Sequence, residues 1–311
     1  MTSLNPCLSR ATWRACCVWA FIAVALGWIG VSHRASAQTA DKPEVAEQEE
    51  KRPENGYWSE GENRFFVSSR NELGLPYLKP YFSAGYGLPH WIWAGIDVNA
   101  IITMEVVEIF GGLRLATPVF DVSFGVRPNW SLNKPFLPKQ SRYTSSDVWN
   151  APGDLARYWA AELDALALIP LPYAALGVNF VMVHTWDTPP NSALYEESYR
   201  LITHTATFYM LRFVALARIL NESALRFGVL AEYGFGTGRG EGVWRAGPIV
   251  SMQLTDHLQF NAGVTLKIDS PDQLGLSLGA FGTAGFRYQW ATGERRPELP
   301  WKGDLIPFAA Y

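Results

Sequence analysis

The chain has 311 residues, of which 26 are basic, 29 are acidic, 48% are apolar and 14% are aromatic, and its mean hydropathy is −0.02. A helical membrane protein of this size would be far more hydrophobic, and a mildly acidic chain offers no electrostatic footprint for nucleic acid. Segments that alternate apolar and polar residues give this intermediate hydropathy without a helical membrane span.

Residues 1–37 are predicted to be a secretory signal peptide. Arg10 and Arg14 precede an apolar run at 18–31, and Ala-Ser-Ala at 35–37 is a small-residue cleavage site. The run is short of the roughly 20 residues that a spanning helix needs, although an uncleaved anchor is the alternative. Cleavage after Ala37 would leave 23 basic and 29 acidic residues, a formal charge of −6.

The three cysteines, Cys7, Cys16 and Cys17, all lie in this leader, so the expected mature chain has none. A chain of this kind has no disulfides, no thiolate nucleophile, no Cys-bound zinc and no iron–sulfur cluster. We expect no cofactor and no metal site, because the sequence has no cluster of metal ligands either.

Residues 38–63 are polar and acidic and are predicted to be a disordered periplasmic linker. Residues 64–290 are predicted to form an all-β, closed, antiparallel, up-and-down transmembrane barrel of about twelve strands. The expected strands are 64–72, 78–87, 90–102, 104–115, 119–130, 154–168, 173–185, 200–219, 224–236, 243–254, 258–269 and 275–290. Ten or fourteen strands, or a soluble β-sandwich, are the alternatives. Residues 291–311 are expected to be a periplasmic tail.

Strict alternation is the basis of this prediction. From Leu258 to Asp269 apolar residues alternate with polar ones, and a period of two places one set on lipid and the other in the lumen. Short joints also alternate with longer ones, as periplasmic turns and extracellular loops do. The longest loop, 131–153, is interpreted as an exposed surface loop, with an inward constriction or a contact to lipopolysaccharide phosphates as alternatives.

The predicted last strand ends in Thr283-Ala284-Gly285-Phe286-Arg287-Tyr288-Gln289-Trp290. This stretch resembles the C-terminal β-signal of bacterial outer-membrane β-barrel proteins, in which Thr283, Gly285, Tyr288 and Trp290 would be the signal positions. The resemblance covers roughly residues 64–290, implies an outer-membrane location and recognition by the barrel-assembly machinery, and identifies no subfamily. Unlike the usual pattern, 21 residues follow the final aromatic residue.

Alternation also assigns charged residues to the lumen. The candidates for lining it are Asp97, Asp121, Arg127, Arg212, Arg218, Arg226, Glu232, Arg245, Lys267, Asp269 and Arg287. Opposed charges can line a water-filled solute path, or they can form ion pairs that fill a closed barrel and only stabilise it. Trp91 and Trp93 are also predicted to point inward, either as a track for a ligand or as packing at the barrel base.

An enzyme is not expected. The one place where a base, an acid and hydroxyls come together in the sequence is His184 with Thr185, Asp187 and Ser192, and no nucleophile signature accompanies it. The favoured function is a passive channel or binding conduit for small polar solutes in the outer membrane. A structural or surface-interaction barrel that acts through its extracellular loops is the alternative, and a lipid hydrolase is a distant third. The expected partners are outer-membrane lipids, lipopolysaccharide and small polar solutes, whereas the oligomeric state is not indicated.

Overall fold

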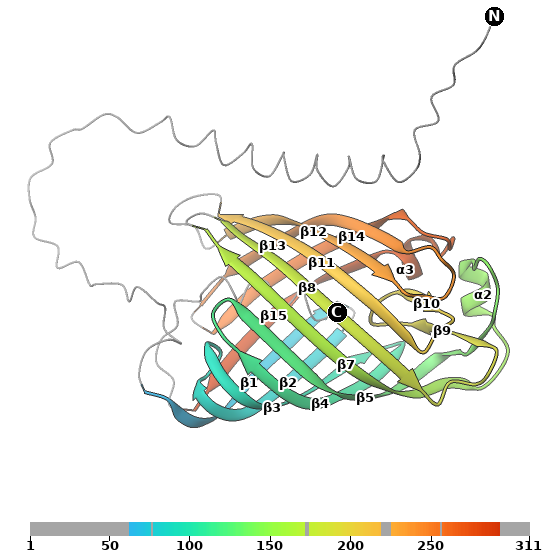
Figure 1. The fold of residues 1–311 in the computed structure, drawn as a ribbon. Helices are drawn as coiled ribbons and strands as arrows, with labels where there is room; N and C mark the ends of the chain where they lie inside the picture. The colour runs from blue at the N-terminus through green and yellow to red at the C-terminus, as the bar shows by residue number, and fades with distance from the viewer. Residues whose placement is uncertain (1–61, 76, 172–173, 219–224, 256, 293–311) are drawn as a thin grey trace, which may run out of the picture. The chain divides into compact units, whose positions relative to one another are not determined.

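The computed structural model describes residues 62–75, 77–171, 174–218, 225–255 and 257–292. In this part of the chain twelve strands close into one antiparallel barrel, in the order β1-β15-β14-β13-β12-β11-β8-β7-β5-β4-β3-β2 (Figure 1). The strands of the barrel are β1 (Arg64–Leu75), β2 (Tyr77–Leu88), β3 (Ile92–Thr103), β4 (Val106–Ala116), β5 (Phe120–Pro135), β7 (Leu155–Pro170), β8 (Ala174–Trp186), β11 (Thr207–Arg218), β12 (Leu225–Phe235), β13 (Val243–Gln253), β14 (Leu258–Asp269) and β15 (Phe281–Ala291). The predicted twelve-stranded barrel is confirmed.

Closure is made by the first and last strands, which pair from Ser68 opposite Ala291 to Leu75 opposite Ala284. The signal peptide and the linker as far as residue 61 lie outside the described residues, as does the tail beyond residue 292.

Side chains alternate between the inside and the outside of the barrel, as a period of two requires. In β8, Val181, Val183 and Thr185 are buried, whereas His184 and Trp186 between and beyond them are exposed. The exposed set is strongly apolar around the whole wall, and includes Phe65, Phe82, Tyr86, Ile96, Leu113, Phe124, Trp159, Ile169, Phe213, Phe227, Leu266, Phe286 and Trp290. The barrel therefore has an apolar outer surface.

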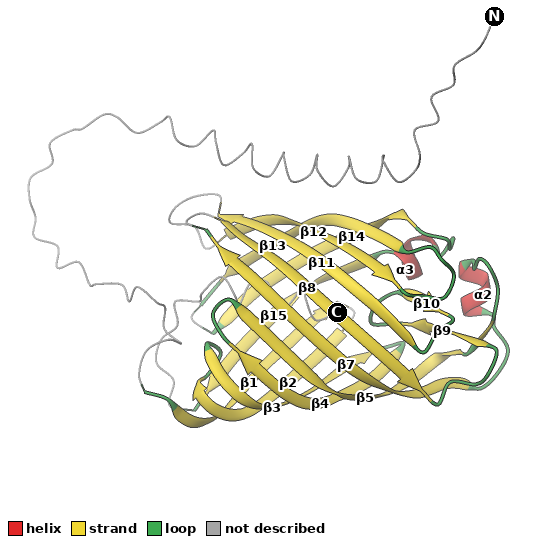
Figure 2. Cartoon of the chain, viewed as in Figure 1, coloured by secondary structure: helices red, strands yellow, loops and turns green. Residues whose placement is uncertain are grey.

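A small second sheet and two short helices gather at one end of the barrel, here called the loop end (Figure 2). The sheet has the order β10 (Leu201–Thr203), β9 (Ser192–Glu196), β6 (Leu137–Pro138), and the helices are α2 (Ser145–Trp149) and α3 (Gly275–Gly279). The opposite end, where β1 begins and β15 ends, is called the turn end. Within the described residues, no helix has the length and apolar character needed to cross a membrane.

The prediction of a single strand over 200–219 was wrong. Leu201–Thr203 belongs to the small sheet, and the barrel strand β11 begins only at Thr207. The break between them is made by hydroxyl groups that compete for backbone partners. The amide of Thr205 donates to Thr203 Oγ1, and Thr205 Oγ1 donates to the carbonyl of Gly236, so the chain turns instead of extending.

The prediction of a strand from 275 was also wrong, because residues 275–279 form α3 and β15 begins at Phe281. Leu274 and Leu278 are both buried in one cluster, whereas Leu276 is exposed. A spacing of four residues puts Leu274 and Leu278 on one helix face, so burial against the loops decides the structure over the local alternation. The expected loop 131–153 is likewise more structured than predicted, since β5 continues to Pro135 and β6 and α2 follow.

Candidate functional site in the barrel lumen

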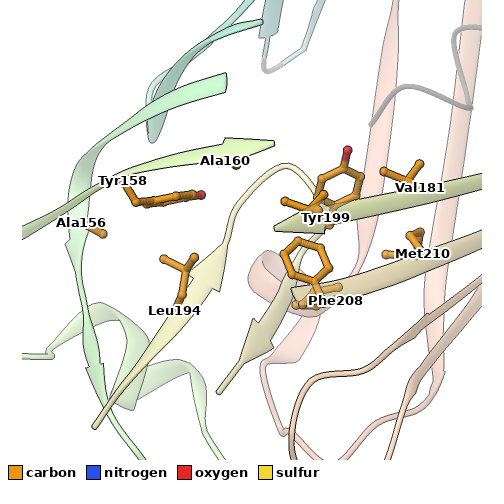
Figure 3. Packing of buried hydrophobic residues seen from close by; sticks show 10 residues of the cluster. Ala156, Tyr158, Ala160, Val181, Leu194, Tyr199, Phe208 and Met210 are labelled. Carbon is orange, nitrogen blue, oxygen red and sulfur yellow. The ribbon is translucent and has the colours of Figure 1, made fainter. Parts of the chain in front are cut away.

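The loop between β8 and β11 folds into the barrel. Residues 192–203 form a hairpin in which Glu196 of β9 lies opposite Leu201 of β10, and it is called the inserted hairpin below. Tyr199 in its tip, residues 196–200, lies beside Phe208 of β11, as Figure 3 shows. The hairpin shares one buried cluster with Tyr158 of β7 and Met210 of β11. The loop end of the lumen is therefore occupied by the chain itself.

Arg127 of β5 links the wall to this hairpin. Its guanidinium lies 3.0 Å from Glu162 and 3.2 Å from Glu196 at the hairpin tip, and it also contacts Glu108. Asn129 donates to the second oxygen of Glu108 at 2.6 Å. Because charged hydrogen bonds that are shielded from water are the strong ones, this cluster fixes the hairpin in the lumen.

Tyr199 at the hairpin tip lies between two arginines. Its ring centroid is 5.7 Å from the guanidinium of Arg127 and 5.4 Å from that of Arg212, and it makes an edge contact with Phe208 at 5.7 Å. Cation–π contacts of this kind gain strength where water is excluded. Tyr199 thus contacts side chains from two strands of the barrel wall, β5 and β11.

Arg245 of β13 holds the backbone of the tip. Its Nη2 donates to the carbonyl of Tyr199 at 2.7 Å, and its Nη1 donates to the carbonyl of Arg200 at 3.3 Å. The Nε of Arg245 lies 3.2 Å from Glu232, whose other oxygen accepts from Arg212 at 2.8 Å. Wall residues from β5, β7, β11 and β13 therefore converge on three hairpin residues, Glu196, Tyr199 and Arg200.

A cavity of about 60 Å³ lies between the hairpin tip and the wall formed by β1 to β5 and β7. Ser198 and Tyr199 line it on the hairpin side. Its charged lining has four basic residues, Arg70, Lys79, Arg114 and Arg127, and five acidic ones, Asp97, Glu108, Asp121, Glu162 and Asp164. At roughly 10–15 Å³ per water, the space is enough for a few water molecules among opposed charges.

Nearer the turn end, one side of the lumen is apolar rather than charged. Leu166, Val214, Leu216, Leu230 and Ile249 are buried inward-facing residues that pack in one cluster with Leu168 and Ala175. On the other side Trp93 packs edge-on against Phe66 at 5.3 Å, with Ala116 beside them. Two apolar clusters therefore line parts of the lumen nearer the turn end, where the polar residues Arg226, Ser251 and Gln259 are also buried.

Contacts between loops make the loop end a single capped unit. Arg239 donates to both oxygens of Asp272, and the amide of Tyr143 donates to the same side chain at 3.0 Å. Tyr143 also contacts His204 at 2.9 Å, and burial together with the nearby Arg239 lowers the pKa of His204. Four loops are joined in this way, so the hairpin is held from above as well as from the wall.

Glu197 is an acidic group of the hairpin whose pKa is shifted by burial. Burial raises its pKa to about 8, even though Lys134 lies 3.8 Å away and Ser131 Oγ donates to it at 2.7 Å. The hairpin therefore binds a proton more tightly when docked than when exposed.

Most of the predicted lumen residues do lie inside the barrel. The buried ones are Asp97, Asp121, Arg127, Arg212, Arg226, Glu232, Arg245 and Arg287. Lys267 is exposed and Asp269 partly exposed at the loop end, where a bulge between Trp244 and Arg245 shifts the register. Arg218 ends β11, and its side chain is outside the described part of the chain.

Trp91 lies in the turn at 89–91 and not in a strand, so alternation does not determine its direction. Trp93 is buried and packs at the turn end, as packing of the barrel base would require. The signal-like residues Thr283, Gly285, Tyr288 and Trp290 all lie in β15, and the last two are exposed on the outer surface.

Sequence reasoning missed the hairpin residues Glu196, Tyr199 and Arg200 and the cavity residues Lys79 and Tyr81. One usable signal was present, because Leu194 and Tyr195 are apolar residues in a predicted loop, where neither lipid nor lumen was expected to cover them.

The residues considered for a hydrolase do not form one site. His184 points outward and contacts Thr207 Oγ1 at 2.7 Å, whereas Thr185 is buried inside and Ser192 Oγ donates to the carbonyl of Pro189 at 2.6 Å. Among the described residues there is also no group of three or more His, Cys, Asp or Glu side chains placed to hold a metal ion.

Comparison with known proteins yields similar folds only. No family model and no curated protein matches this chain. The KdgM porin is 10% identical, with a TM-score of 0.36, over 72% of this chain and 99% of that one. A loop-deletion mutant of OmpT, an outer membrane protein of Vibrio cholerae, is 9% identical, with a TM-score of 0.34, over 76% of this chain and 100% of that one. The NanC porin is 8% identical over the same shares, also with a TM-score of 0.34.

Proposed function

We propose that this protein is an outer-membrane barrel that acts as a conduit for small polar solutes and is held shut by its inserted hairpin. The membrane location is supported by the apolar outer surface, which in water would be a large exposed patch. Exposed aromatic residues near both ends fit two membrane interfaces. They are Phe65, Tyr86, Tyr288 and Trp290 at the turn end, and Trp130, Trp159 and Trp186 at the loop end.

The observation that supports a conduit is the kind of element that closes the loop end. The element that blocks the loop end is a hairpin on a loop, held by polar contacts to Arg127 and Arg245, and behind it lies a charged cavity. A wall packed only for stability would have no need of a separate insert. A loop, unlike a strand, can leave the lumen without breaking any barrel pairing.

The test is single-channel conductance in planar bilayers. The refolded wild type is expected to be closed for most of the time. A variant in which a short Gly-Ser linker replaces residues 192–203 is expected to give stable open steps. A matched control changes the exposed residues 139–142 to Gly and Ser and is expected to behave like the wild type.

A folded, heat-resistant barrel that stays silent after removal of the hairpin would overturn the conduit. It would favour the alternative function, in which the barrel presents its loops to a partner. The fusion of four loops through Asp272 and Tyr143 is the observation that supports this alternative.

A further inference from the structure

The guanidinium of Arg245 has the geometry of an oxyanion-binding group, but here its acceptors are carbonyl oxygens of the hairpin backbone. Its two terminal nitrogens donate to two neighbouring carbonyl oxygens, those of Tyr199 and Arg200. Two acceptors on one guanidinium edge are the arrangement that a carboxylate, sulfate or phosphate group offers to arginine. The carbonyls are neutral, so they accept the hydrogen bonds of the guanidinium but bring no negative charge to it.

Other contacts of the hairpin also resemble those that a bound solute would make. Arg212 lies beside Arg245 on the shared carboxylate of Glu232, and the ring of Tyr199 covers its guanidinium at 5.4 Å. The side chains of Arg212 and Arg245 are 1% and 2% exposed, so water does not weaken contacts made there. The tip fills this part of the lumen as a planar, oxygen-bearing solute would.

Withdrawal of the hairpin removes acceptors from two wall arginines. It takes the carboxylate of Glu196 away from Arg127, and it takes the carbonyls of Tyr199 and Arg200 away from Arg245. An oxyanion adds the attraction of opposite charges to the two hydrogen bonds, so it would bind the guanidinium of Arg245 more strongly than the neutral carbonyls do.

We propose that Arg245, with Arg212 beside it, is a binding site for a small oxyanionic solute, which the tip of the inserted hairpin occupies as a built-in substitute ligand. The inference rests on the proposed function, because the solute reaches the site only when the hairpin leaves. An oxyanionic solute and the hairpin therefore compete for the same guanidinium.

Competition can be measured without any conductance. Amide hydrogen exchange of residues 192–203 is followed in the folded full-length mature protein with increasing sodium gluconate, at constant ionic strength. Gluconate is expected to speed exchange in this segment severalfold, whereas glucose, a neutral solute of similar size, leaves it unchanged. Sodium sulfate serves as a second probe, and a response to it but not to gluconate assigns the site to tetrahedral oxyanions.

Two variants identify the guanidinium. R245Q is expected to abolish the response to gluconate, and R245K, which keeps the charge but loses the two-nitrogen edge, to weaken it at least tenfold. R157Q removes an equal charge from the outer surface of β7 and is expected to respond like the wild type. The same response in R245Q and R245K as in the wild type would overturn the assignment.

The variant without residues 192–203 separates this inference from the proposed function. Gluconate binding to it, measured by calorimetry, is expected to be tighter than to the wild type and to depend on Arg245. A silent barrel that binds gluconate through Arg245 refutes the conduit and retains the anion site. An open barrel with no Arg245-dependent binding refutes the anion site and retains the conduit.

Discussion

Arg127 Nη1 lies 3.2 Å from Glu196 Oε1, and this contact joins the barrel wall to the tip of the inserted hairpin. Both side chains are almost fully buried, at 3% and 0% exposure. Tyr158 donates to the other oxygen of Glu196, so the carboxylate is held from two strands. One acidic side chain that the loop carries inward therefore ties the hairpin to two strands of the wall.

Replacing Glu196 by Gln is expected to loosen the hairpin without unfolding the barrel. The neutral amide loses the charge-assisted bond to Arg127, which is worth about 1.5–3 kcal/mol, although Glu108 and Glu162 still neutralise the arginine. Hydrogen exchange of residues 192–203 should rise roughly 10- to 100-fold, with strand amides unchanged. E241Q, in the exposed loop after β12, is the control, and equal protection in both variants would contradict this role for Glu196.

The barrel could be predicted from the sequence because the alternation of apolar and polar residues that indicates it lies within each strand. A period of two places Val181 inside and Trp186 outside whatever lies across the lumen. The insertion of 192–203 could not be predicted in this way. It depends on Arg127, Arg212 and Arg245, which come from three different strands and meet the hairpin only after closure. The adjacent acidic residues Glu196 and Glu197 are by themselves typical of a solvated loop.

Docking of the hairpin is expected to weaken as the pH rises from 7 to 9. The pKa of Glu197 is about 8 when the hairpin is docked, against about 4.3 in an exposed chain, because burial disfavours its charged form. A raised pKa in the docked state means stability that is complete below the lower value and is lost as the pH passes through the upper one.

Exchange of residues 192–203, corrected for its intrinsic pH dependence, should therefore increase across this range, and E197Q should remove the increase. His204 does not interfere, because its lowered pKa keeps it neutral above pH 7. An increase of equal size in E197Q would assign the effect to another group.

Gly112 and Gly111 are neighbours on β4, and replacing them by alanine is expected to change the stability of the barrel very differently. A Cβ on Gly112 would lie 2.3 Å from the carbonyl oxygen of Phe124 and 2.8 Å from the ring of Phe110, whereas one on Gly111 would meet nothing within 4 Å. G112A is expected to destabilise the barrel by about 1–3 kcal/mol through overpacking. Urea unfolding followed by tryptophan fluorescence measures this, with G111A as the internal control. Equal midpoints for the two variants would refute the close approach.

The ion pair between Arg287 and Glu72 crosses the seam where β15 meets β1. These residues lie directly opposite each other, and Arg287 donates to Glu72 through Nε at 3.0 Å and through Nη2 at 2.8 Å. Both are buried, so removing Arg287 leaves a carboxylate that water does not reach, with the more distant Arg70, at 3.7 Å, as a partner for Glu72. Arg287→Met alone is expected to cost about 3–5 kcal/mol, whereas the double change with Glu72→Met restores most of the stability. Thermal unfolding of the three proteins measures the difference. Additive losses in the double variant would mean that the pair does not act as a unit at the seam, and that backbone pairing alone closes the barrel.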